Sequence, residues 1–286
     1  MNLVLRSRDR DLGGFSVRRV LPAIERRLVG PFVFWDHMGP ATFEPAHGLD
    51  VRPHPHIGLA TVTYLFEGEI VHKDTLGSDQ SIQPGAVNWM VAGRGIAHSE
   101  RTSPRARREG SRVHGIQSWV ALPLDLEETA PSFEHHPAGS IPEATLDGVR
   151  LRVLAGAAYG LKAPARILSP TFYVEAELSA AMRIALPQEY EERAAYVVEG
   201  AVVADGRTIH AGEMVVAAPG IDCVILGEQR SRVMLLGGAR LDGPRHVWWN
   251  FVSSSEERIE QARRDWKEGR FGKIAGDDVE FIPLPE

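Results

Sequence analysis

The chain has 286 residues and only one cysteine, Cys223, which excludes an intrachain disulfide framework and favours a reducing compartment. It also lacks an apolar run of the ~20 residues that a membrane span needs. The N-terminal residues contain no apolar core of signal-peptide length. We therefore expect a cytoplasmic protein that has no membrane partner. Cys223 lies in an apolar run, where we expect a buried and inert thiol.

Positive charge is also in short supply. The 32 Lys and Arg residues are outnumbered by 38 Asp and Glu residues, so the formal net charge is −6. Such a chain has no general positive field to attract DNA or RNA, and we expect no direct nucleic-acid binding. One basic run, residues 101–108, contains Pro104. We predict a solvated loop there in preference to the rim of an anion-binding site.

Long helical patterns are scarce, whereas short β-type runs recur along the chain. Turn residues such as Gly68, Gly77 and Gly85 return about every ten positions between these runs. This spacing is typical of an all-β barrel or jelly roll and not of βαβ units. A helical pattern with serine caps, early glutamates and an apolar stripe is found at residues 253–269. We predict a short C-terminal helix there.

Two pairs of side chains that can bind a metal stand out. His54 and His56 are separated by one residue, and so are His98 and Glu100. Because alternate side chains of a strand point to the same face, two neighbouring strands would bring three imidazoles and one carboxylate together. This donor set suits Fe, Mn, Cu, Ni or Zn and is too rich in nitrogen for Ca or Mg. We predict one divalent transition metal per chain, bound by these four residues.

The strand that follows the first pair supplies the expected wall of the metal pocket. If the pleat continues unbroken from His56, four apolar side chains share the face of the histidines: Ala60, Val62, Tyr64 and Phe66. They would suit a flat hydrophobic ligand, although any filled barrel needs a similar wall. Gly58 could break this alternation, because a glycine inside a strand often marks a bend or a bulge.

The second half of the chain repeats the first. Tyr64-Leu-Phe-Glu-Gly68 returns as Tyr196-Val-Val-Glu-Gly200, and Gln83-Pro-Gly85 returns as His210-Ala-Gly212. Such self-similarity indicates a duplicated fold. Projected through these offsets, the four predicted ligands fall on residues that cannot replace them: Leu186, Gln188, Ile225 and Gly227. We predict that the second barrel has kept the fold and lost the metal site.

The residues around the two ligand pairs resemble the pirin family. The resemblance rests on these segments: His54-Pro-His-Ile-Gly58, Trp89-Met90, Ala92-Gly-Arg-Gly-Ile96, His98-Ser-Glu100, Phe34-Trp-Asp-His-Met-Gly-Pro40 and His114-Gly-Ile-Gln-Ser-Trp119. It is dense from residue 32 to residue 123 and looser beyond. It implies a bicupin, which is a pair of tandem cupin-type β-barrels. It also implies a non-haem metal, usually iron, on the four predicted ligands, and all four are present.

The repeat and the resemblance together predict how the chain is divided. We assign the N-terminal cupin barrel with the metal site to residues 1–125 and a connection to residues 126–167. The C-terminal cupin barrel without a metal site, followed by the helix, takes residues 168–286. We expect Trp248, Trp249 and Phe251 to cover an apolar face between the two halves.

Five further histidines have expected roles outside the ligand set. We interpret His37 as a hydrogen-bonded structural residue, with a contact to the metal pocket as the alternative. His114 is interpreted in the same way, with pocket lining as its alternative. We expect the adjacent pair His135-His136 to face solvent and His246 to lie between the two halves.

The pirin resemblance implies a flavonol 2,3-dioxygenase (quercetinase) activity. In that reaction Glu100, the expected catalytic residue, takes the proton of the substrate 3-hydroxyl, and the heterocycle opens with O₂ to release carbon monoxide and a depside. We therefore expect an oxidoreductase that acts on a flavonol-like aromatic substrate and O₂. The same resemblance implies an alternative, a redox- or metal-responsive regulatory protein that contacts a transcription factor or a metabolic enzyme without turnover. A metal-dependent isomerase or hydrolase is a third hypothesis, because one fold hosts many reactions.

Overall fold

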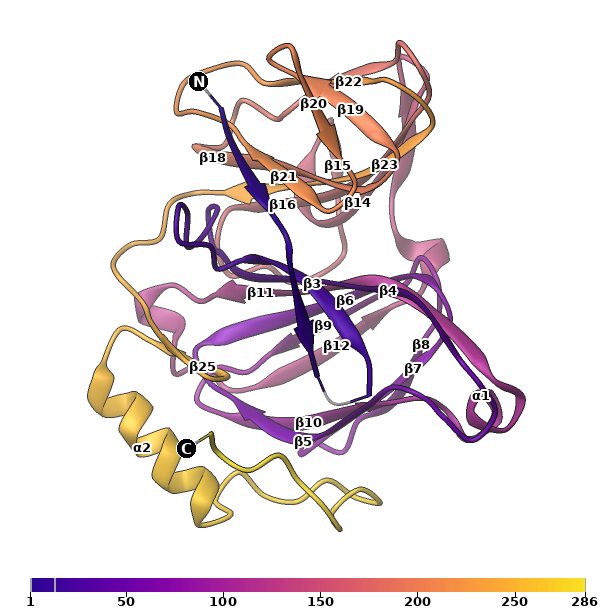
Figure 1. The fold of residues 1–286 in the computed structure, drawn as a ribbon. Coiled ribbons are helices and arrows are strands. Elements are labelled where there is room, and N and C mark those ends of the chain that lie inside the picture. Colours follow the sequence, from indigo (N-terminus) through magenta and orange to yellow (C-terminus); the bar gives the residue numbers. More distant parts are fainter. Residues whose placement is uncertain (1, 13, 286) are drawn as a thin grey trace. The chain divides into compact units, whose positions relative to one another are not determined.

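The computed structural model describes residues 2–12 and 14–285, which group into two compact units (Figure 1). Unit 1 contains the described residues of 1–10, 17–37 and 139–241, and unit 2 contains those of 11–16, 38–138 and 242–286. The C-terminal stretch 242–286 therefore groups with the first metal-competent half of the chain. The predicted sequence boundaries, at residues 125/126 and 167/168, cut the chain differently and stay a prediction.

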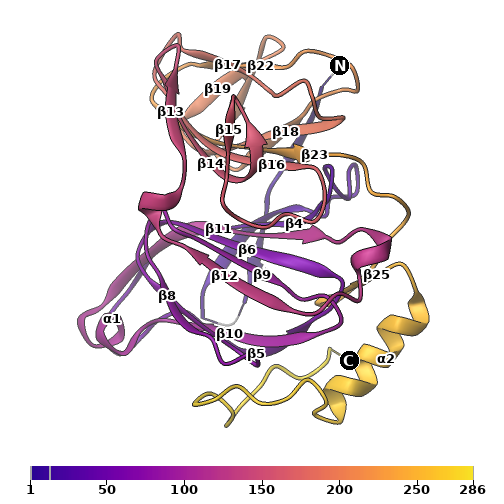
Figure 2. The ribbon, with the colours of Figure 1, turned by 180° about the vertical axis from the view of Figure 1, so that it is seen from behind.

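Unit 2 consists of two layers of strands, which Figure 2 shows from behind. One layer has the order β12-β9-β6-β11 and continues into the end of β4, and the other has the order β5-β10-β7-β8. The first layer is made of β4 (Phe32–Phe43), β6 (Leu59–Glu67), β9 (Val87–Val91), β11 (Ser111–Ala121) and β12 (Ser132–His136). The second is made of β5 (Asp50–His56), β7 (Ile70–Asp74), β8 (Asp79–Ile82) and β10 (Ile96–Arg101).

Two local features of unit 2 differ from the sequence analysis. The basic run 101–108 is not a loop, because helix α1 (Pro104–Glu109) begins inside it. The Ser103 side chain accepts a hydrogen bond from the backbone N–H of Ala106, and proline is well tolerated in the first turn that follows. The predicted connection, residues 126–167, contains the paired strand β12 and the short helical turn η2 (Ala138–Ser140), and the turn η1 (Leu124–Leu126) overlaps its start. Three strands of unit 1, β13 to β15, also lie inside it.

Unit 1 also carries two sheets. The larger one has the order β1-β21-β18-β23-β16-β14-β13, with β15 paired to β14, and the smaller one has the order β17-β22-β19-β20. The strands of these two sheets begin with β1 (Leu3–Arg6), whereas β2 (Arg8–Asp11) and β3 (Ser16–Leu21) follow β4 in the order β4-β3-β2. The others are β13 (Glu143–Leu146), β14 (Val149–Ala158), β15 (Leu161–Lys162), β16 (Thr171–Leu178), β17 (Arg183–Ala185), β18 (Glu192–Glu199), β19 (Ala201–Ala204), β20 (Arg207–His210), β21 (Glu213–Val216), β22 (Val224–Gly227) and β23 (Ser231–Gly238).

The two repeats end their matching strands in the same way. β6 and β18 both finish at a Glu-Gly pair, and the glycines, Gly68 and Gly200, have φ angles of 88° and 80°. A side chain on either glycine would overlap a backbone carbonyl oxygen, that of Arg112 or that of Arg230. Only glycine meets both demands without strain, so the sequence repeat corresponds to a repeated backbone turn.

The C-terminal part of unit 2 is an apolar assembly beside β5, one of the strands that carry the predicted ligands. It includes β24 (His246–Trp248), β25 (Phe251–Ser253) and helix α2 (Glu256–Lys267), which begins at the N-cap Ser255 as predicted. The buried residues Ile57, Phe251, Ile259 and Ala262 form its centre, and Trp248, Trp249, Trp266, Phe271 and Leu284 pack against them. The aromatic group that we expected between the halves thus packs within unit 2. No helix in the described ranges is long and apolar enough to cross a membrane.

This assembly predicts a large difference between two phenylalanines of the same segment. Phe251 is fully buried at its centre, whereas Phe281 is 57% exposed. We expect Phe251→Ala to lower the free energy of unfolding by about 3–5 kcal/mol, because it leaves a cavity among aromatic rings. The matched control Phe281→Ala should cost less than half as much. Urea denaturation followed by tryptophan fluorescence measures both, and equal losses would contradict the packing described here.

Candidate metal centre

Three of the four predicted ligands meet on neighbouring strands. His54 and His56 lie on β5 and His98 lies on β10, and the antiparallel register sets His98 opposite His54. The three imidazole rings have centroid separations of 4.4, 4.9 and 5.0 Å. The Nε2 atoms of His56 and His98 are 3.1 Å apart. All three side chains are buried, with at most 6% exposed, so they form one compact cluster of nitrogen donors.

A contact at the Nδ1 edge orients each ring. Nδ1 of His54 lies 2.9 Å from the carbonyl oxygen of Arg52, and Nδ1 of His56 lies 3.1 Å from that of Asn250. Since a carbonyl only accepts, both Nδ1 atoms carry the proton and both Nε2 atoms keep a free lone pair. Nδ1 of His98 lies 3.3 Å from Nδ1 of His72. The Nε2 edges of His54 and His56 are thereby left as metal donors, which is the arrangement expected around a bound transition metal.

Glu100, the fourth predicted ligand, lies beside this cluster in a second group. Two groups of metal-capable side chains lie close together here. The carboxylate of Glu100 belongs to the group with His98 and His72, whereas the other group contains only the three histidines. The Gln117 side-chain amide donates to Oε2 of Glu100 at 2.8 Å, and the Thr63 hydroxyl lies 3.1 Å from Oε1. Within the described residues both groups belong to unit 2, and the projected positions Leu186 and Ile225 lie in the apolar core of unit 1.

His72 was not among the residues predicted for the site. It lies on β7, which pairs with β10 so that His72 faces Glu100 and Asp74 faces His98. His72 and Asp74 have the same one-residue spacing as the two ligand pairs, and this spacing was a usable signal in the sequence. The two groups of metal-capable side chains share His98 and together contain five residues.

Burial controls the charge of these groups. It lowers the pKa of His54 to about 4, against the opposing effect of the Arg52 carbonyl. It also lowers the pKa of His56 and of His98 well below the ordinary value, and neighbouring histidines add to the effect. Burial raises the pKa of Glu100, against the opposing effects of His72, Thr63 and Gln117. The three imidazoles are therefore neutral near pH 7, which is the form that binds a metal.

The side chains beside the candidate metal centre are not the ones that we expected. Thr63 contacts Glu100, so its neighbours in β6, Val62 and Tyr64, point to the opposite face. The predicted wall of Ala60, Val62, Tyr64 and Phe66 is therefore wrong. The reason is Gly58, which separates β5 from β6 with a φ of 67° and has no room for a side chain beside the carbonyl of Val252.

The real wall mixes polar and aromatic groups. The register of β6, β9, β11 and β12 brings the following residues onto the face of Thr63: Thr61, Gln117, Trp119, Asn88, Met90, Phe133 and His135. The Trp119 ring lies 5.2 Å from that of His56, and the Phe133 ring stacks on His72 at 4.3 Å. Such a wall offers flat apolar surfaces together with hydrogen-bonding groups.

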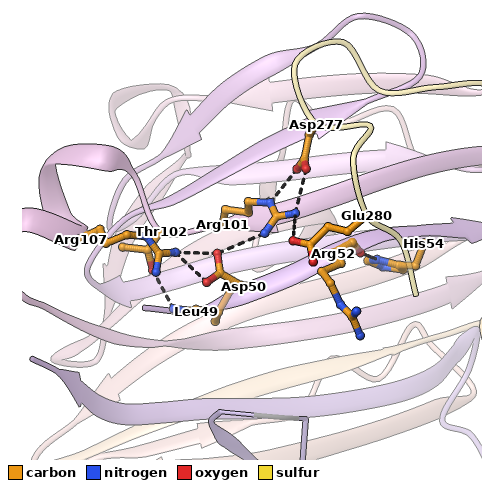
Figure 3. Close-up of polar contacts among 9 residues, drawn as sticks. All are labelled: Leu49, Asp50, Arg52, His54, Arg101, Thr102, Arg107, Asp277 and Glu280. Carbon is orange, nitrogen blue, oxygen red and sulfur yellow. Dashed lines mark hydrogen bonds and ion pairs between the residues drawn. The ribbon is translucent and has the colours of Figure 1, made fainter. Parts of the chain in front are cut away.

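The outer faces of β5 and β10 are tied to the C-terminal segment (Figure 3). Arg101, next to Glu100, donates to Asp277 at 2.7 and 2.8 Å and to Glu280 at 3.0 Å. Arg107 of α1 donates to Asp50 at 2.6 and 2.7 Å. A cavity of about 710 Å³ lies along this network, and its arginines are engaged by carboxylates of the chain. The strands that carry the predicted ligands are thus held from outside by charge pairs.

The remaining histidines that we singled out have partners of their own. Nδ1 of His37 lies 2.8 Å from the Tyr196 hydroxyl and Nε2 lies 3.1 Å from Arg18, in accord with a structural role. His114 is buried with its ring 4.9 Å from that of Phe66. His135 and His136 lie on β12 and contact Asn88 and Glu134, so the expectation that they simply face solvent is wrong. His246 pairs with Glu256 at 3.2 Å.

Two family models match the chain. The model described as Pirin matches residues 14–120, and the one described as Pirin C-terminal cupin domain matches residues 173–272. The second match identifies the repeated half as a cupin. Together with the paired sheets of each unit, it confirms the predicted all-β fold of two cupin-type barrels with a short C-terminal helix.

Individual relatives match over nearly the whole length. A pirin-like protein of Caulobacter vibrioides is 53% identical over 289 residues, which is 100% of both chains. A Pseudomonas aeruginosa protein, provisionally named quercetin 2,3-dioxygenase, is 40% identical over 96% of this chain and 87% of its own. A solved structure of quercetin 2,3-dioxygenase from Acinetobacter baumannii has a TM-score of 0.92 and 33% identity, covering 100% of this chain and 95% of that chain.

The buried histidines predict how stability depends on pH without a metal. The pKa of His54 is 6.5 in the unfolded chain, whereas burial lowers the pKa to about 4 in the folded chain. Since the unfolded state binds more protons between these values, the metal-free protein should lose stability as the pH falls from 7 toward 4. His54→Gln should make the thermal midpoint depend less on pH. The matched control is His47→Gln at an exposed position. Identical pH profiles for the two variants would contradict this prediction.

Proposed function

Because this chain belongs to the pirin family, we propose that it is a metal-dependent dioxygenase that opens the flavonol ring of quercetin-like substrates. The single observation that carries the proposal is the cluster of three buried, neutral imidazoles whose Nδ1 edges are anchored, with a buried carboxylate beside it. The relatives that carry the name quercetin 2,3-dioxygenase support the same reaction class.

We propose that His54, His56, His98 and Glu100 hold one divalent transition metal, with iron as the expected metal. Three imidazoles and one carboxylate suit first-row transition metals, and they leave positions free for other ligands. The neutral state of the buried imidazoles removes proton competition near pH 7. When bound, such a metal acidifies a hydroxyl group that coordinates it and provides a site for O₂ chemistry.

Glu100 is proposed as the group that accepts the proton of the substrate 3-hydroxyl. Burial raises the pKa of this carboxyl, and a carboxylate with a raised pKa is a stronger base once it is ionised. Gln117 and Thr63 hold both of its oxygens, which limits the rotation of the carboxylate. The side chain can therefore present the same oxygen to the substrate in every cycle.

The wall around Glu100 suits a polyphenol better than a plain hydrocarbon. The rings of Trp119 and Phe133 offer flat surfaces on which an aromatic ligand can pack. Thr63, Asn88 and Gln117 share the same face and can hydrogen-bond to hydroxyl groups of the ligand. A flavonol presents both features, a flat ring system and several hydroxyls.

Metal stoichiometry tests the ligand assignment. We expect one metal per chain after loading and removal of excess metal, because the second barrel has lost the ligand positions. The double variant His54→Ala, His98→Ala should retain almost none, since two imidazoles are removed from the donor set. The control His47→Ala, at an exposed position, should load like the parent protein. Two metals per chain, or full retention by the double variant, would contradict the assignment.

Turnover tests the role of Glu100. We expect oxygen-dependent bleaching of quercetin by the metal-loaded protein, above the rate of the free metal ion, with release of carbon monoxide. With the metal site saturated, Glu100→Gln should lower turnover by about 10²- to 10⁴-fold, because an amide cannot accept the proton. The control Glu69→Gln changes a carboxylate on the turn between β6 and β7 and should leave turnover unchanged. A turnover rate of Glu100→Gln within a few-fold of the parent rate would mean that Glu100 is only a metal ligand.

A further inference from the structure

We propose that His72 and Asp74 act as a positioning relay, which holds His98 in the one tautomer that can bind the metal. The inference rests on the proposed function, because His98 is itself a proposed ligand. It concerns two residues that the ligand assignment does not use. Both are buried, with 2% and 1% of their surface exposed.

The contacts form a continuous chain from a backbone-anchored carboxylate to the ligand. Oδ1 of Asp74 accepts hydrogen bonds from the backbone N–H groups of Leu76 and Ser78, at 2.9 and 3.0 Å. Its other oxygen, Oδ2, lies 3.0 Å from Nε2 of His72. At the opposite edge of the same ring, Nδ1 of His72 lies 3.3 Å from Nδ1 of His98. The two links from Asp74 through His72 to His98 are direct contacts between buried side chains.

The direction of these hydrogen bonds follows from the carboxylate. Burial alone would raise the pKa of Asp74, but the hydrogen bonds from His72 and Ser78 outweigh it and lower the pKa, so Asp74 is ionised and only accepts. His72 therefore carries a proton on Nε2, and the relay assigns Nδ1 of the same ring as an acceptor. In the relay, His98 donates from its own Nδ1 to that acceptor. This leaves a lone pair on Nε2 of His98, the atom that lies 3.1 Å from Nε2 of His56.

The surroundings hold the His72 ring in this orientation. It stacks on Phe133, with ring centroids 4.3 Å apart and an angle of 11° between the planes. The register of β7 and β10 sets His98 opposite Asp74 and Glu100 opposite His72. The ring thus has little freedom to turn, which is the requirement for a residue that orients another.

Geometry argues against His72 as a ligand of the same metal. His72 contacts the Nδ1 edge of His98, whereas His56 contacts the Nε2 edge. The two nitrogens of one imidazole point in diverging directions, so an ion among the Nε2 atoms lies on the far side of the His98 ring. His54 and His56 are anchored by backbone carbonyls, and the carboxylate of Asp74 does the equivalent work for His98 through one intervening ring. Outer partners of this kind also raise the basicity of a ligand.

Metal affinity tests the relay without relying on catalysis. We would measure the Kd of Co²⁺ and Zn²⁺ by competition with a chelator, together with the visible absorption of the Co²⁺ form. His72→Phe keeps the stacking on Phe133 but removes the acceptor, so we expect an affinity about 10- to 100-fold lower. His72→Asn keeps an acceptor oxygen near the position of Nδ1 and should restore affinity to within a few-fold of the parent. Asp74→Asn removes the charge and should weaken binding by about 10-fold.

Two controls separate the relay from general effects on folding. His114→Phe also places a phenylalanine at a buried histidine. His114 packs on Phe66, which shares a strand face with Val62 and Tyr64, and that face points away from the histidine cluster. His114→Phe should leave the Kd unchanged. Circular dichroism and the thermal midpoint report whether each variant is folded. If His72→Phe does not fold, the metal Kd of Asp74→Asn compared with that of the parent decides whether the relay holds.

The outcomes distinguish failure of the relay from failure of the metal site. If the parent binds metal, His98→Ala does not, and both His72→Phe and Asp74→Asn match the parent, the relay is wrong and the metal site stands. Complete loss of metal binding in His72→Phe, together with a changed Co²⁺ spectrum in His72→Asn, would show that His72 is a ligand and would overturn the relay. If His98→Ala binds as tightly as the parent, the ligand assignment fails, and the relay fails with it.

Discussion

The candidate metal centre depends on one strand pairing, that of β5 with β10. Each strand carries two side chains with alternate spacing, and the antiparallel register sets His98 directly opposite His54. A shift of one residue would turn every side chain of a strand to the other face and separate the imidazoles. The register is supported from outside by charge pairs, in which Arg101 of β10 binds Asp277 and Glu280. Inside, each imidazole is held by its Nδ1 edge.

What the sequence could predict was local and periodic. The one-residue spacing of the ligand pairs, the repeated Glu-Gly turns and the serine-capped helix depend on neighbours in the chain, and the structure contains all three features. The grouping of the three histidines followed from this spacing, once two strands were assumed to pair. The spacing did not predict that Glu100 would lie beside His72, because His72 comes from a third strand, β7, which pairs with β10.

The features that the sequence did not predict depended on long-range packing or on one backbone angle. Gly58 adopts a positive φ, and this reverses the alternation that would have put Val62 and Tyr64 beside the metal-competent side chains. A glycine in a sequence permits such an angle without requiring it. Asn250 supplies a carbonyl to His56 across 194 residues, and no periodic pattern reports a contact of that kind. The grouping of residues 242–286 with unit 2 was hidden for the same reason.

The contribution of the last residues has a consequence for the order in which this protein is made. Ligand strands β5 and β10 are synthesised within the first 101 residues, yet the carbonyl that anchors His56 belongs to Asn250, and the backbone N–H of Ile282 binds the carbonyl of Pro53. During translation all three histidines are therefore made well before Asn250, whose carbonyl anchors His56. A chain that stops before Asn250 therefore contains all three histidines but lacks the carbonyl that orients His56.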